Sequence, residues 1–172
     1  MRRPARSNGR VTFRVFEQSS VVGAPSDLVW QRITDFTGVN HELMPVMRMR
    51  VPRRHRDATV TTVPVGEPLG RVWILYLGFL PLDYDDLMLT ELQPGSHFQE
   101  VSTMLSMRRW EHRRELRPID AGRTEVTDTV GFEPRLTFLA PGLEPVLRRI
   151  FAHRHRRLAR HFEDAVPNAN RP

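Results

Sequence analysis

The sequence predicts an α+β domain in which a curved antiparallel β-sheet wraps around one long carboxyl-terminal α-helix. One alternating segment near the amino terminus is followed by two short stretches with helical spacing. Residues 71–132 then alternate apolar and polar side chains between turn residues, as consecutive antiparallel strands do. The chain closes with an amphipathic stretch whose apolar stripe needs a large surface to cover.

The first elements are a strand and two short helices. Alternation over residues 11–22 predicts a half-buried strand. Pro25 then opens a helix, because proline fits the first helical turn, and this helix is expected to end near Gly38. A second helical turn at residues 39–44 ends before Pro45, since proline disfavours the helical conformation in the residue that precedes it.

The middle of the chain is predicted to be mostly β-structure. A short strand at residues 47–51 is followed by a long connection at residues 53–70, which can carry a strand at residues 58–63. Pro-Gly, Ala-Gly and Pro-Leu-Asp turn signals separate five further strands, at residues 71–79, 84–92, 98–107, 108–116 and 124–132. The break between the third and fourth of these is weak, and a sharp bend near Met107 fits equally well.

The last element is a helix from about Leu143 to Ala165. Its apolar stripe consists of Leu147, Ile150, Phe151, Leu158 and Phe162. Residues 1–10 and 166–172 show no period and are expected to be loose tails, which leaves a single domain at residues 11–165. A chain of 172 residues is long enough for one sizeable core and too short for two ordinary ones.

The composition excludes several classes of protein. All 26 basic residues are arginine, which we attribute to codon usage and which accounts for the pI of about 11.1. Without cysteine the chain has no disulfide, Cys-ligated zinc, iron–sulfur cluster or thiol nucleophile. No apolar stretch follows the basic amino terminus, and the longest apolar run, residues 72–82, is too short to span a bilayer. We therefore expect a cytoplasmic protein without a transmembrane helix.

Four segments carry a resemblance to a known superfamily: EQSSVVGAPSDLVWQRITDFTGVNHELMP (17–45), FQEVSTMLSMRRWEHRREL (98–116), TEVTDTVGFEP (124–134) and LRRIFAHRHRRL (147–158). With the order of elements, they resemble the START/SRPBCC (Bet v 1-like) superfamily, including its polyketide cyclase/dehydrase group, over about residues 11–164. The resemblance implies the helix-grip fold, whose sheet and closing helix enclose an apolar cavity for a lipid, polyketide or other hydrophobic ligand. A shared fold permits many functions, so the function has to be argued from the site.

His112 and Asp128 form the first candidate pair. One strand face carries Trp110, His112, Arg114 and Leu116, and one face of the following strand carries Val126, Asp128, Val130 and Phe132. If Leu116 pairs with Thr124 across the turn, that register also places the two candidates opposite each other. A carboxylate among apolar residues needs a partner, which His112 or Arg114 can supply. The pair is either an acid/base dyad that faces the cavity or a structural pair that joins two strands.

Further residues can anchor a ligand. Phe98, Glu100, Ser102 and Met104 share one strand face, and the alternation does not show whether this face or the more apolar opposite one points inward. If it points inward, Glu100 and Ser102 are polar anchors; otherwise they belong to a solvated face. His155 lies close to the apolar stripe of the closing helix, where it can contact ligand or bond to a strand end. The residues expected to contact ligand are Trp73, Glu100, Ser102, Trp110, His112, Arg114, Phe151 and His155.

Arg71 and Tyr84 can orient an oxygen-bearing ligand, the first through its charge and the second through its hydroxyl. Trp73 is expected mainly in the core, because large aromatic side chains are usually buried. If the protein is an enzyme, the catalytic candidates are Arg71, Tyr84, His112 and Asp128. A cyclase-like activity then requires these four residues to converge on one pocket.

The sequence predicts no metal and no cofactor. Its histidine and aspartate spacings do not match zinc-peptidase or calcium-loop patterns, and it has no phosphate loop, nucleophile elbow or dinucleotide fingerprint. The arginine runs lack the interleaved aromatic residues of a single-strand-binding groove, which argues against nucleic acid as a partner. We expect binding or carriage of a hydrophobic small molecule. A polyketide aromatase/cyclase-like enzyme and a peripheral binder of anionic surfaces or membranes are the alternatives.

Overall fold

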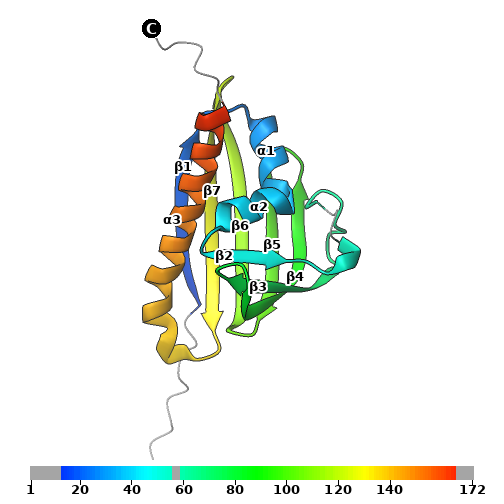
Figure 1. Cartoon of the computed structure of the whole chain (residues 1–172), viewed down its shortest axis with the longest axis vertical. Coiled ribbons are helices and arrows are strands. Elements are labelled where there is room, and N and C mark those ends of the chain that lie inside the picture. Colours follow the sequence, from blue (N-terminus) through cyan, green and yellow to red (C-terminus); the bar gives the residue numbers. More distant parts are fainter. Residues whose placement is uncertain (1–12, 56–58, 166–172) are drawn as a thin grey trace, which may run out of the picture.

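A seven-stranded antiparallel sheet forms the body of the protein and curves around the long helix α3 (Figure 1). The computed structural model describes residues 13–55 and 59–165. Its elements are β1 (Arg14–Val22), α1 (Ser26–Thr34), α2 (Phe36–Leu43), β2 (Met47–Arg50), η1 (Arg53–His55), β3 (Pro68–Tyr76), β4 (Leu80–Gln93), β5 (His97–Met104), β6 (Met107–Asp120), β7 (Arg123–Pro134), η2 (Thr137–Leu139) and α3 (Ala140–Ala165). The predicted α+β architecture, with a curved sheet and a long closing helix, is confirmed.

The strand order is β1-β7-β6-β5-β4-β3-β2. Short turns connect the strands from β3 to β7 in chain order. Strand β1 pairs with β7 at the edge of the sheet opposite β2. Helices α1 and α2 carry the chain from β1 at one edge to β2 at the other, and α3 contacts β1, β7 and α2 (Figure 1). The helices therefore close the concave face of the sheet, and the interior lies between them and the strands.

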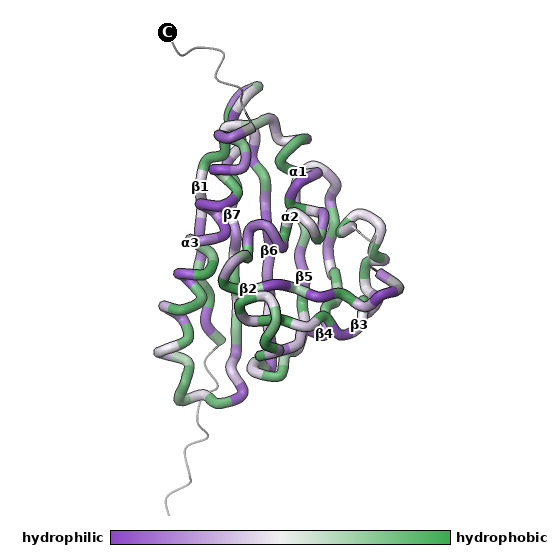
Figure 2. Tube along the Cα trace, viewed as in Figure 1, coloured by the Kyte–Doolittle hydropathy of each residue, from purple (hydrophilic) through white to green (hydrophobic). Residues whose placement is uncertain are grey.

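Two apolar clusters fill this interior. One contains Val22, Val29, Trp30, Ile33, Leu116, Val126, Leu158 and Phe162, and the other contains Phe16, Met104, Met107, Trp110, Val130, Phe132 and Phe151. Strands β1, β6 and β7 and helix α3 each contribute to both clusters. On each of these elements, polar residues lie between the residues of one cluster and those of the other. Figure 2 shows the resulting alternation of hydrophobic and hydrophilic residues along the trace.

Asp35, rather than Gly38, separates the two short helices. Asp35 has an extended backbone (φ −92°, ψ 135°), and its side chain accepts a hydrogen bond from the Thr37 amide at the start of α2. This aspartate caps the second helix, as short polar side chains do. Gly38 lies inside α2, where a Cβ atom would come within 1.8 Å of the Arg32 carbonyl oxygen. The glycine therefore permits close contact between the two helices and does not end the first.

Several other predicted boundaries are wrong. The strand predicted at residues 58–63 does not form where the structure describes it: Thr59 makes an isolated bridge with Asp35, and residues 60–62 form a turn. The turn between β3 and β4 lies at residues 77–79, where Leu77 and Gly78 have positive φ, and not at the Pro-Leu-Asp sequence. The bend between β5 and β6 lies at residues 105–106, which agrees with the alternative of a sharp bend near Met107 rather than with a break between residues 107 and 108. The tails predicted at residues 1–10 and 166–172 lie outside the described residues.

Helix α3 is long but carries many charged side chains. Within the described residues, no helix has both the length and the hydropathy needed to cross a membrane.

Candidate functional site

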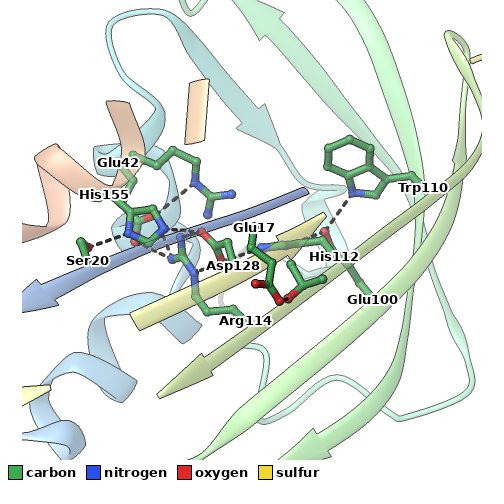
Figure 3. A network of polar contacts seen from close by, with 11 residues as sticks. Glu17, Ser20, Glu42, Glu100, Trp110, His112, Arg114, Asp128 and His155 are labelled. Carbon is green, nitrogen blue, oxygen red and sulfur yellow. Dashed lines mark hydrogen bonds and ion pairs between the residues drawn. The ribbon is translucent and has the colours of Figure 1, made fainter. Parts of the chain in front are cut away.

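A mostly buried polar layer lies between the two apolar clusters, and Figure 3 shows its network of polar contacts. It consists of Ser20 from β1, Glu42 from α2, His112 and Arg114 from β6, Asp128 from β7, and Arg154 and His155 from α3. The alternation of each strand turns these side chains toward the concave interior, and the helical spacing of Phe151, His155 and Leu158 does the same on α3. Since buried charges must be paired, the layer is held by reciprocal ion pairs and hydrogen bonds.

Arg114 is the centre of this polar layer and is fully buried. Its Nε and Nη2 atoms donate to the two carboxylate oxygens of Asp128 at 2.6 and 2.7 Å. Its Nη1 atom donates to both oxygens of Glu42 at 3.0 and 2.9 Å, and Glu42 also accepts from Nε of Arg154 at 3.1 Å. A planar guanidinium suits such bidentate contacts, so one side chain ties α2 to the sheet.

Asp128 accepts four hydrogen bonds. Besides the two from Arg114, its Oδ1 atom accepts from Nε2 of His112 at 2.8 Å and its Oδ2 atom from Nε2 of His155 at 3.0 Å. The other ring nitrogen of His155 lies 2.6 Å from the Ser20 hydroxyl. Burial alone would raise the pKa of Asp128, but the Arg114 guanidinium, through its charge and hydrogen bonds, holds that pKa well below its usual range, with His112 adding to the effect.

His112 bridges two carboxylates. Its Nε2 atom faces Asp128, and its Nδ1 atom lies 3.1 Å from Oε1 of Glu100. Because a carboxylate can only accept, both ring nitrogens donate, which requires the imidazolium form. Burial opposes this charge, yet Asp128 and Glu100 outweigh burial and raise the pKa of His112. For Glu100 burial likewise opposes ionisation, and His112, Arg154 and the Trp110 indole together lower its pKa.

A cavity of about 390 Å³ adjoins the polar layer. Its wall is mainly apolar and includes Leu43, Met47, Met49, Ile74, Leu82, Met104, Met107, Trp110, Leu147, Ile150 and Phe151. Five ionisable side chains interrupt this wall: Asp83, Asp85, Glu100, His112 and Arg154. A mostly apolar wall with a few convergent polar groups is the usual composition of a small-molecule site.

The structure brings only part of the expected residues to this cavity. Glu100, Trp110, His112 and Phe151 line it. The face that carries Phe98, Glu100, Ser102 and Met104 points inward, although it is the less apolar face of its strand. Ser102 is buried beside the cavity, and its hydroxyl has no hydrogen-bond partner among the described residues.

Arg114 and His155 do not line the cavity, contrary to expectation. The side chains of both residues bond within the polar layer, where Arg114 is 0% and His155 2% exposed. The predicted register of β6 and β7 was also wrong by two residues: Leu116 pairs with Val126, because β6 continues to Asp120 before the tight turn at residues 121–122. Since a shift of two keeps every side chain on the same face, His112 still reaches Asp128, diagonally rather than directly.

Arg71, Trp73 and Tyr84 lie on the outer face of the sheet, so the expected convergence of Arg71 and Tyr84 with His112 and Asp128 is wrong. Trp73 is 42% exposed and therefore is not a core residue. Its ring packs edge-to-face on Tyr84 at 5.9 Å, and the Arg71 guanidinium lies 3.9 Å above the Tyr84 ring. The cause is the alternation of β3: Val72 and Ile74 occupy its inner face, so Arg71 and Trp73 point outward. Tyr84 lies on β4, where it is paired with Trp73 and shares the outer face.

Sequence reasoning missed Ser20, Glu42, Asp85 and Arg154. Glu42 is fully buried in a short helix, and no periodicity distinguishes it from a solvated glutamate. Asp85 could have been found, because it shares the inward period of Leu87 and Leu89 on β4. Its neighbours in the sheet are Val72 and Met104, both buried.

Solved structures with the same fold cover nearly the whole chain. The Zhui aromatase/cyclase from Streptomyces sp. R1128 is 18% identical, with a TM-score of 0.64 over 92% of this chain and 99% of that one. A START superfamily protein from Mycobacterium smegmatis is 12% identical, with a TM-score of 0.66 over 88% and 99% of the two chains. Ara h 8.0201 is 10% identical, with a TM-score of 0.55 over 86% and 98%. The fold is therefore the helix-grip fold of the START superfamily, as the resemblance implied.

These similarities concern the fold alone, since the identities are low. Among curated protein sequences, none matches this chain. One family model matches residues 20–162, which include every residue of the polar layer and of the cavity wall. By this match the chain belongs to the family described as Domain of unknown function (DUF8410).

Proposed function

We propose that the protein binds a hydrophobic small molecule, such as a lipid or a polyketide, in the cavity between the sheet and α3. The observation that carries this proposal is the cavity itself: about 390 Å³ of space with an apolar wall and polar groups on a few strands. Burial of apolar ligand surface against such a wall supplies the main driving force for binding, and the polar groups select orientation.

The lining suits ligands of more than one shape. Four of its side chains are methionines, Met47, Met49, Met104 and Met107, which are unbranched and adapt to irregular surfaces. Met47 and Met49 lie on β2, Met104 ends β5 and Met107 begins β6. Binding or carriage requires only this apolar lining and one or two polar anchors.

Binding is favoured over a cyclase-like activity by the state of His112. Both of its ring nitrogens are engaged by carboxylates, so the ring has no free position from which to exchange a proton with a ligand. Arg71 and Tyr84, which that activity would also need, lie outside the cavity. A cytoplasmic location and contact of the α3 arginines with anionic surfaces remain predictions from the sequence.

Native mass spectrometry of the purified protein, followed by denaturing extraction, tests the proposal. We expect a stoichiometric hydrophobic molecule to co-purify or, if the expression host lacks the ligand, to be taken up from an added lipid extract. A protein that stays empty in both experiments would contradict the proposal.

Filling the cavity should abolish this binding. In Met104→Trp, the larger side chain occupies space that Met104 shares with Trp110 and Ile74, so we expect ligand occupancy to fall at least tenfold, because overlap with an indole excludes the ligand. The matched control is Leu105→Trp, which places the same side chain one residue later at a position that is 55% exposed. Native mass spectrometry of both variants is the measurement. Equal occupancy in the two variants would place the ligand elsewhere.

A further inference from the structure

Asp85 is a buried carboxyl group without a cation. It is 1% exposed, it lines the cavity, and its Oδ1 atom has no hydrogen-bond partner in the part of the chain that the structure describes. The other fully buried carboxylates, Glu42 and Asp128, are each paired with Arg114 at 3.0 Å or less. In a chain with 26 arginines and a net charge of +6, this carboxyl group is an exception.

The positive side chains around the cavity are already paired. His112 on β6 lies between Glu100 and Asp128, and Arg154 on α3 donates to Glu42. Together with Arg114, these two cations balance the three carboxylates of Glu42, Glu100 and Asp128. Asp85 is left outside this balance.

The remaining charged groups near Asp85 are negative. On its own strand, Asp83 accepts hydrogen bonds from the Ser106 backbone and hydroxyl, and Asp86 faces outward and pairs with Arg71. On the neighbouring strand β5, Glu100 points into the same cavity. The side chains that β2 and β3 contribute to the cavity are the uncharged Met47, Met49 and Ile74.

This environment holds Asp85 in its neutral form when the cavity is empty. Burial raises the pKa of Asp85 to about 8, and the negative charge of Glu100 adds to the effect; the nearby Ser102 hydroxyl opposes it, and Asp83 and Asp86 raise the pKa further by smaller amounts. A positive charge beside Asp85 would stabilise the ionised carboxylate, because it would bind the unpartnered carboxylate oxygen and would be attracted by the negative side chains nearby. The rings of Trp110 and Phe151 line the same cavity, and aromatic faces also attract cations.

We propose that Asp85 anchors a protonated amine, so that the ligand is a hydrophobic small molecule with a basic nitrogen. This inference rests on the proposed function and specifies the ligand class of the same cavity. On binding, Asp85 releases its proton to solvent, and an ammonium N–H donates to its Oδ1 atom. A neutral ligand whose carbonyl accepts a hydrogen bond from protonated Asp85 is the competing case, and it leaves the negative neighbours uncompensated.

A pair of probes with one ring system tests the inference: 2-naphthylmethylamine and 2-naphthalenemethanol, titrated by isothermal calorimetry. At about pH 8.5 we expect wild type to bind the amine at least roughly tenfold more tightly than the alcohol. Below pH 8 the amine affinity should fall by up to roughly tenfold per pH unit, because Asp85 must lose a proton first. Near pH 6.5, titrations in buffers of different ionisation enthalpy should show release of close to one proton per amine bound.

Asp85→Asn keeps the size of the side chain and removes its charge. We expect this variant to lose the preference for the amine and to keep its affinity for the alcohol, which also shows that it is folded. Asp86→Asn is the matched control, since Asp86 is the next residue on β4 and faces outward. Because the Asp86 charge contributes least to the raised pKa of Asp85, this variant should keep the preference for the amine, with only a small change in affinity.

The outcomes separate the two proposals. If the alcohol binds as tightly as the amine, or if Asp85→Asn leaves amine binding unchanged, the ammonium site is wrong while the hydrophobic cavity stands. Alcohol affinity that rises as the pH is lowered would favour the competing case, in which protonated Asp85 donates to a ligand oxygen, and amine affinity that does not fall below pH 8 would overturn the ammonium site. If neither probe binds and the protein also stays empty in native mass spectrometry, the proposed function fails and this inference fails with it.

Discussion

Replacing Arg114 by methionine should destabilise the protein by about 3–5 kcal/mol, because it leaves buried carboxylates without their main partner. Arg114 is 0% exposed and donates to both oxygens of Asp128 and of Glu42. Without it, Asp128 keeps only His112 and His155, and Glu42 keeps Arg154. Since folded domains are stable by only about 5–15 kcal/mol, this loss is a large fraction of the total.

Urea unfolding followed by circular dichroism measures this effect. The matched control is Arg71→Met, because the Arg71–Asp86 pair is about half exposed on the outer face and such pairs contribute less than about 1 kcal/mol. Adding Asp128→Asn to Arg114→Met should restore part of the lost stability, because it removes the unpaired charge. If Arg114→Met unfolds at the same urea concentration as Arg71→Met, then the polar layer contributes little to the stability of the fold.

The stability of the wild type should fall as the pH rises from about 4 to 8, and Asp85→Asn should remove most of that slope. Burial holds the folded pKa of Asp85 at about 8, against its ordinary value of 3.8, so in this range the folded protein holds a proton that the unfolded chain has lost. Stability then decreases with pH by at most about 1.4 kcal/mol per unit. Asparagine does not titrate, so the variant should be the more stable form, and its advantage should grow up to about pH 8.

Other groups in the protein also change stability with pH, so the difference between variant and wild type is the quantity to measure. The lowered pKa values of Glu100 and Asp128 stabilise the fold above the usual carboxyl range, and that stabilisation is lost at acidic pH. The raised pKa of His112 stabilises the fold below its unfolded value, and that stabilisation is lost at higher pH. Both contributions are common to wild type, Asp85→Asn and the control Asp86→Asn. Thermal unfolding at a series of pH values should give nearly parallel curves for wild type and Asp86→Asn, because Asp86 contributes least to the raised pKa of Asp85. A flat difference between Asp85→Asn and wild type would contradict a buried neutral carboxyl.

The sequence determined the architecture and the contents of each strand face. Period-two alternation placed Trp110, His112, Arg114 and Leu116 on one face, and all four are buried. That assignment is correct although the predicted register is wrong by two residues, because an even shift leaves every side chain on the same face of its strand. The apolar stripe of the closing helix was likewise readable, since it must cover a sheet.

Only the tertiary structure decided which faces enclose the cavity and which charges meet. Alternation sorts the side chains of a strand into two faces. It does not show which face lies on the concave side of the sheet, because that depends on where the helices dock. The less apolar face of β5 therefore points inward, while Trp73 and Tyr84 point outward. Glu42 and Arg114 are 72 residues apart, and no local pattern couples them. Asp85 lacks a cationic partner for the same reason: among the described residues, the strands and helix that bury it bring no free cation to it, and the sequence alone does not specify that arrangement.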